Sequence, residues 1–256
     1  MTRIARLTVL RVRRQFLDWS GAWWFLLTLV ANETLGPLVG LFVWSTVFPG
    51  DPRIVAYFVA LTAVQMMTAS YENHTFSETV YSGTVSHELL KPQPVVIGPI
   101  GENLAIRIWL TLFGLPVVVV AAWSLGASYQ LRHLLLAVPA LLFAALLRFL
   151  FTWTLALAAF WTERVHAVVT FGWLVTFVLG GAAAPVGLLP EPWRAVAVTL
   201  PFYAMLGLPA DIATGTIGGA DALVAFGRAL AWILAFGGLA AVVWRAGVRR
   251  YTVIGA

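Results

Sequence analysis

The sequence predicts an all-α integral membrane protein, and two observations support this fold class. Of the 256 residues, 61% are hydrophobic and only 11% are charged, whereas soluble domains are about 25% charged. The apolar residues also gather in runs, most of which approach the roughly 20 residues that a helix needs to cross a bilayer. This composition excludes both a soluble globular domain and a disordered chain.

The first segment, residues 1–18, predicts an amphipathic helix on the membrane surface. Arginines alternate there with apolar residues at helical spacing, which is typical of a helix lying in the interface. They are Arg3, Arg6, Arg11, Arg13 and Arg14. A cleaved signal peptide is the competing interpretation, but no small-residue cleavage site precedes a polar region.

Six hydrophobic runs follow, and we expect each to span the membrane. They cover residues 19–47, 54–70, 108–125, 133–160, 165–184 and 223–244. Six spans put both termini on one side. Placing the termini in the cytoplasm leaves few basic residues outside: Arg53, Arg132, Arg194 and Arg228. Because basic residues resist translocation, this asymmetry favours cytoplasmic termini.

Two connections between the spans are long. We expect residues 71–102 to form a cytoplasmic loop, in which residues 78–90 predict a short helix that Pro92 and Pro94 end. Such a helix can lie along the membrane or dock into a groove on a cytoplasmic partner. The outer connection, residues 185–222, is apolar, and prolines divide it into pieces too short to span. We therefore expect short re-entrant helices there.

Within the predicted spans we single out the polar residues Asn32, Glu33, Gln65 and Arg148. A charge at membrane depth is costly unless it meets a partner or water, so these side chains should face the bundle interior. Glu33 and Arg148 have matching depths. They are interpreted either as part of a translocation path or as a buried structural ion pair, and both interpretations stay open.

Several kinds of chemistry are excluded. The chain has no cysteine, and its single lysine, Lys91, follows Leu90 rather than a glycine, so no phosphate-binding Gly-Lys-Ser/Thr step exists. His87-Glu88 begins like the zinc motif His-Glu-x-x-His, but Lys91 takes the place of the second histidine. We therefore predict no catalytic residue, no metal site and no cofactor on this chain.

Three stretches carry a family resemblance. In the inner loop the matching residues are Tyr81, Gly83, His87, Glu88, Leu89, Leu90, Lys91 and Pro92. Before the last span they are Pro185, Pro190, Pro201, Phe202 and Pro209. The chain ends with Arg249-Arg250-Tyr251 and Gly255. In these stretches and in its six-span layout, the chain resembles the permease subunits of ABC-2 type ABC transporters, in the branch of small six-span permeases that work beside a separate ATPase.

The resemblance implies one transmembrane domain over residues 1–256, with a coupling helix near residues 79–90. It implies an exporter of a hydrophobic or amphipathic compound such as a drug, antibiotic or lipid. The implied partners are a cytoplasmic ABC ATPase dimer, which binds ATP and Mg²⁺, and a second permease, identical or sister. We expect a bacterial or archaeal cytoplasmic membrane and no nucleic acid. The alternative function is a polytopic membrane enzyme acting on lipid through Glu33, Arg148 or His87.

Overall fold

The computed structural model describes residues 3–21, 23–162 and 165–251, and it is helical over 82% of the chain. The longer helices are α2 (Trp23–Val47), α3 (Pro52–Thr68), α6 (Ile97–Ser124), α7 (Leu131–Leu157), α8 (Val165–Leu179) and α12 (Gly219–Arg250). The other α-helices are α1 (Arg3–Ser20), α4 (Glu72–Tyr81), α5 (Val85–Leu89), α9 (Trp193–Thr199), α10 (Pro201–Met205) and α11 (Gly207–Ala213). Short 3₁₀ turns η1 (Ala158–Phe160) and η2 (Val186–Leu188) complete the described secondary structure, which contains no strand.

Among the described residues, five helical segments are long and apolar enough to cross a membrane, which confirms a multi-pass all-helical fold. They are Leu27–Val47, Pro52–Tyr81, Ile97–Ser124, Leu131–Phe160 and Gly219–Arg250. The predicted span at 165–184 corresponds to α8, which has 15 residues. A helix of that length reaches about 22 Å, less than the roughly 30 Å of a bilayer core. The sixth span therefore stays a prediction.

The cytoplasmic loop expected over residues 71–102 is mostly helix, which corrects the sequence-based interpretation. Residues 72–81 form α4, and α6 begins at Ile97 rather than at residue 108. The prediction was wrong because it took the polar residues of this stretch as a sign of contact with water. The side chains of Glu72, Asn73 and Ser77 are instead buried against the bundle. Hydropathy alone does not distinguish a polar loop from a helix whose polar groups are paired internally.

The single helix expected over residues 78–90 is divided into α4 and α5. The chain turns at residues 82–84, where Gly83 has a φ of +75°. Only glycine adopts this left-handed conformation without steric cost. We call residues 81–91, which include α5, the α4–α5 elbow. Pro92 lies in the bend that follows it.

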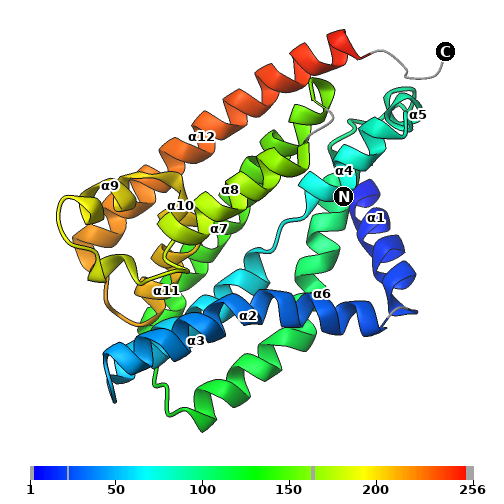
Figure 1. Ribbon diagram of the computed structural model, residues 1–256. Coiled ribbons are helices and arrows are strands. Elements are labelled where there is room, and N and C mark those ends of the chain that lie inside the picture. The colour runs from blue at the N-terminus through cyan, green and yellow to red at the C-terminus, as the bar shows by residue number, and fades with distance from the viewer. Residues whose placement is uncertain (1–2, 22, 163–164, 252–256) are drawn as a thin grey trace.

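The bundle has two distinct ends. Figure 1 shows α1, α5 and the C-terminal end of α12 at one end, and the α2–α3 turn with α9, α10 and α11 at the other. The predicted N-terminal helix is confirmed as α1, although Met1 and Thr2 lie outside the described residues. It lies across the end of the bundle (Figure 1) and packs on α6, where the rings of Phe16 and Trp109 stack at 4.4 Å.

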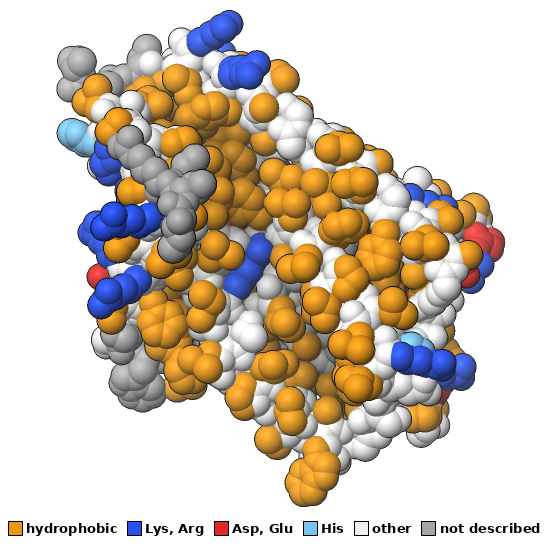
Figure 2. Space-filling model, turned by 180° about the vertical axis from the view of Figure 1, so that it is seen from behind, with side chains coloured by type: hydrophobic (Ala, Val, Ile, Leu, Met, Phe, Trp, Pro, Cys, Tyr) orange, Lys and Arg blue, Asp and Glu red, His pale blue; other side chains and the backbone are white. Residues whose placement is uncertain are grey.

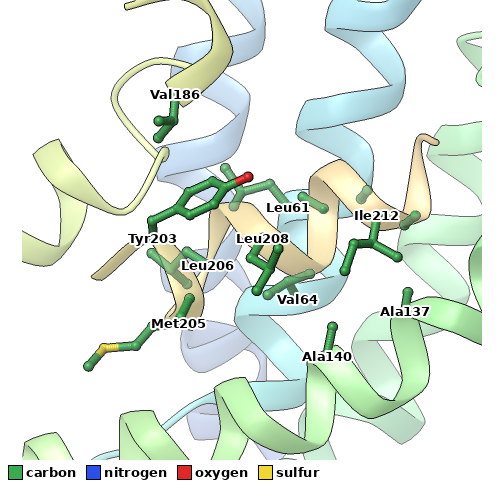
Figure 3. Close-up of a cluster of buried hydrophobic side chains, with 14 of the residues drawn as sticks. Leu61, Val64, Ala137, Ala140, Val186, Tyr203, Met205, Leu206, Leu208 and Ile212 are labelled. Atoms are coloured by element: carbon green, nitrogen blue, oxygen red, sulfur yellow. The ribbon is translucent and has the colours of Figure 1, made fainter. Parts of the chain in front are cut away.

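The core at the opposite end is built around α10 and α11. Every residue of α11 is buried, and Figure 3 shows Leu206, Leu208 and Ile212 facing side chains of α3 and α7. The α7 positions facing them are alanines, Ala137 and Ala140, whose small side chains let the short helices approach closely. This packing explains why an apolar outer segment folds onto the bundle instead of extending into solvent.

The outer surface of the bundle is broadly apolar. Figure 2 shows hydrophobic side chains covering one face, with basic side chains along its upper, left and right borders. Large residues such as Trp123 (85% exposed) and Leu234 (69% exposed) contribute to the apolar surface of the molecule. Soluble monomers do not expose apolar area on this scale, so the surface fits a lipid environment.

The α11 core should determine stability. Leu208 is 1% exposed, so Leu208→Ala should lower the free energy of unfolding by about 2–5 kcal/mol. The matched control is Leu234→Ala on the exposed face of α12, which should change stability little. Tryptophan fluorescence of the detergent-solubilised protein during denaturation measures both, and equal effects would contradict the packing described here.

Candidate functional site

An interrupted helix lies at the centre of the site. The candidate span Pro52–Tyr81 is broken between α3, which ends at Thr68, and α4, which begins at Glu72. Such a break releases backbone carbonyl groups from helical hydrogen bonds. Within a membrane these groups must find partners inside the protein, because lipid offers none.

Two side chains of α6 supply those partners. The Arg107 guanidinium donates to the carbonyl oxygens of Ala69 at 2.9 Å and Thr68 at 3.4 Å, and to that of Ala145 on α7 at 2.8 Å. Asn103 donates to the Ala69 carbonyl at 3.2 Å and the Ser70 hydroxyl at 3.0 Å. The break in one helix thus joins three helices.

A buried carboxylate completes this network. Glu72, at 2% exposure, accepts hydrogen bonds from the Asn103 amide and from the Thr152 hydroxyl, the latter at 2.7 Å. The Arg107 charge also acts on it electrostatically. Sequence reasoning missed Glu72, Asn103 and Arg107 as site residues. The available signal was the four-residue spacing of Asn103 and Arg107, which places both on one helix face.

A cavity of about 300 Å³ opens beside the break, between α2, α4, α7 and α8. All four polar residues predicted within spans line it, which are Asn32, Glu33, Gln65 and Arg148. The structure thus brings together side chains that lie more than one hundred residues apart in the chain. Its remaining polar lining comes from residues near the break and on α7 and α8, and its apolar lining comes mainly from α7 and α8.

Glu33 and Arg148 lie close together at the wall of this cavity, so both interpretations left open by the sequence stay open. The Glu33 Oε2 and Arg148 Nη2 atoms lie 3.8 Å apart, with side chains 7% and 14% exposed. Both residues line the cavity at the same time. Tyr71, in the break, donates its hydroxyl to Glu33 Oε1 at 2.5 Å. The ion pair is therefore held at the wall of the cavity rather than sealed in the core.

The predicted coupling residues lie on and around the α4–α5 elbow, which is tied to three other parts of the chain. The Tyr81 hydroxyl donates to the Thr162 carbonyl after α7 at 3.1 Å, and the Tyr251 hydroxyl donates to the Gly83 carbonyl at 3.2 Å. Arg11 of α1 pairs with Glu88 at 3.5 Å. Tyr251 lies at the end of α12, so both chain ends contact this elbow.

The C-terminal part of the elbow faces outward, whereas its first helical residue is buried. Leu89 is 37% exposed and Leu90 is 84% exposed, while Val85 is fully buried. Lys91 forms an ion pair with Glu88, three residues earlier in the chain. His87 is exposed. In the described part of the chain, no three His, Cys, Asp or Glu side chains gather as a metal site would require.

The prolines and the phenylalanine singled out in the outer segment, residues 185–222, lie at helix ends, in connections or in packing contacts. Pro185 precedes η2, and Pro201 is the first residue of α10. Phe202 meets Phe151 of α7 edge to face at 5.7 Å. Pro190 is exposed in the connection between η2 and α9, and Pro209 lies within the buried helix α11. Gly255, part of the predicted terminal motif, lies outside the described residues.

These features define the class of the protein. A bundle of long apolar helices, a polar cavity between them and an exposed elbow at one end describe a membrane-spanning transport subunit. The family model described as "ABC-2 family transporter protein" matches residues 51–255. The chain therefore belongs to the ABC-2 transporter family as a permease, a transport component that works with an ABC ATPase and is generally not itself an enzyme. No curated protein matches the chain.

The network at the break predicts a large stability effect. Arg107→Met removes the donors to three carbonyl groups and leaves Glu72 buried without its cation, so unfolding should become easier by about 3–5 kcal/mol. Arg132→Met, at an exposed position on α7, is the control and should stay within about 0.5 kcal/mol of wild type. Adding Glu72→Gln to Arg107→Met should recover part of the loss in a thermal unfolding assay. If the double variant is as unstable as Arg107→Met alone, the electrostatic interaction between Arg107 and Glu72 is contradicted.

Proposed function

We propose that the chain is the membrane-spanning subunit of an ATP-driven exporter that moves a hydrophobic or amphipathic compound out of the cytoplasm. The family supports a transport permease. The observation that carries the export proposal is a cavity with a polar and an apolar part, connected by α4 to an elbow that exposes Leu90 at one end of the bundle.

The elbow is the proposed point of contact with the ATPase. An exposed leucine at the tip of a short helix suits a hydrophobic groove on a partner, as in other helix-in-groove interactions. The elbow contacts Thr162, Tyr251 and Arg11. Through these contacts, a displacement of α5 would be transmitted to the α7–α8 turn, α12 and α1. ATP and Mg²⁺ belong to the partner, a cytoplasmic ATPase dimer.

The break at residues 69–71 is the proposed hinge. Displacing α4 relative to α3 changes the positions of Tyr71 and Asn73, both of which line the cavity. Hinge residues at helix ends are a common means of switching between two states. The partner shifts the population of these states through its different affinity for each.

The finer topology is also part of the proposal. We assign the sixth membrane span to α8 together with the first residues after it. We assign α9 to α11 as re-entrant helices on the outer side of the membrane. Both termini then lie in the cytoplasm of a bacterium or archaeon, with α1 on the inner membrane surface. A second permease, identical or sister, completes the assembly.

Leu90→Asp tests the docking surface. The substitution should abolish co-purification with a co-expressed partner ABC ATPase, because a charge replaces the apolar tip. Folding should be unaffected, since Leu90 contributes little to the core. Leu131→Asp, an equally exposed leucine (71%) at the opposite end of the bundle, is the control and should retain the ATPase. Equal retention by both variants would refute docking at α5.

The Arg11–Glu88 pair tests whether α1 takes part in coupling. Both side chains are partly accessible, 30% and 27% exposed, and ion pairs near the surface contribute about 1 kcal/mol or less to stability, so charge reversal should leave the protein folded. Arg11→Glu and Glu88→Arg should each reduce transport per ATP hydrolysed in proteoliposomes containing the ATPase. The double reversal should restore the ratio. Lack of restoration would show that the pair does not transmit motion.

A further inference from the structure

Asp211 is a buried acid that lacks a basic partner. It lies on α11, whose residues are all buried, and its own exposure is 5%. Among the described residues, no Lys, Arg or His side chain forms an ion pair with it. By contrast, the buried Glu33 and Glu72 each have an arginine acting on them. Because an isolated carboxylate is costly to bury, the packing of α11 depends on the charge state of Asp211.

Two tyrosine hydroxyl groups lie near this carboxyl. The Tyr203 hydroxyl of α10 donates to Asp211 Oδ2 at 2.6 Å. The Tyr57 hydroxyl of α3 is close enough to interact electrostatically with Asp211, but it donates to the Gly181 carbonyl at 2.9 Å. Figure 3 shows the Tyr203 ring extending over the cluster that α10 and α11 form with α3 and α7. One neutral donor offsets only part of the cost of a buried charge.

The ionised groups on the elements around α11 are exposed or partly exposed. They are Asp51, Arg53, Arg132, Glu191, Arg194, Asp221 and Arg228. The ring of His133, on α7, lies directly against Gly215, which follows α11. Imidazole groups titrate in the weakly acidic range. His133 is therefore the competing source of any pH dependence in this segment.

The buried position of Asp211 favours its neutral form. Burial raises the pKa of Asp211 to about 6, and the hydrogen bond from Tyr203 opposes that rise. When α11 opens locally, the carboxyl meets water and its pKa returns toward the ordinary value of 3.8. The closed state therefore binds the proton more tightly than the open state. The stabilisation is fully present below about pH 4 and is lost as the pH rises through about 6.

We infer that Asp211 is a proton-binding site that controls how tightly α10 and α11 dock onto α3 and α7. The neutral acid fits the buried position. Loss of its proton leaves a buried charge without a cation, so the two short helices leave the bundle more often. Acid in the outer medium then holds this end of the bundle closed. That this end is the outer one rests on the proposed function; the proton dependence does not.

Hydrogen–deuterium exchange of the purified permease in nanodiscs, without ATPase, tests the inference. Protection of the α10 and α11 amides, corrected for the intrinsic pH dependence of exchange, reports local opening of this segment. Between about pH 5 and about pH 7.5, opening should become about tenfold more favourable in the wild type, given the two pKa values above. In Asp211→Asn, which has no ionisable group at this position, opening should not change with pH.

Three further variants identify the titrating group. Asp221→Asn removes an exposed carboxyl from the first turn of α12 and should keep the wild-type pH dependence. His133→Gln should keep it as well. Tyr203→Phe removes the donor that stabilises the charged form of Asp211, so the carboxyl should hold its proton to higher pH and the transition should move upward.

The inference is overturned if opening of the wild type does not change with pH. It is also overturned if the pH dependence persists in Asp211→Asn or disappears in His133→Gln. None of these results bears on the exporter proposal, because exchange is measured without the partner. The expected exchange behaviour together with no ATP-driven transport would support the proton site and contradict the exporter proposal.

Discussion

The arrangement of this bundle depends on one constraint: a helix broken at membrane depth must have its backbone carbonyls satisfied by protein. Arg107 and Asn103 meet that requirement at residues 68–70. Because Arg107 also bonds to Ala145 of α7, the same guanidinium fixes the relative positions of α3, α6 and α7. The break in turn requires the buried Glu72 to be paired, which Asn103 and Thr152 achieve. The local break between α3 and α4 therefore depends on side chains that other helices supply.

Some polar groups at the break hold the helices together, and others line the cavity. The network of Glu72, Asn103 and Arg107 has its hydrogen bonds made, whereas Asn73 keeps an unpaired acceptor in the cavity lining. A fully paired buried network rigidifies a bundle.

The end of the bundle that carries α1 brings distant parts of the chain together. Arg11, Thr162 and Tyr251 all bond to the α4–α5 elbow, and Phe16 stacks on Trp109 of α6. None of these contacts is strong alone, since surface ion pairs and single hydrogen bonds are each worth about 1 kcal/mol. Together they place one short helix in contact with both chain ends, so that its position is coupled to several long helices.

Composition and hydropathy alone determined that this chain is helical and multi-pass, because a bilayer requires long apolar helices whose backbone groups pair internally. The motif around Leu89, Leu90 and Lys91 likewise pointed to the correct family. Only the tertiary structure decided that residues 72–81 and 97–107 belong to the bundle. Their polar side chains resemble a solvated loop until the partners of Glu72, Asn103 and Arg107 are known, and those partners lie on other helices. The meeting of Glu33 with Arg148 and the unpaired oxygen of Asn73 were decided in the same way, since pairing depends on packing and not on local sequence.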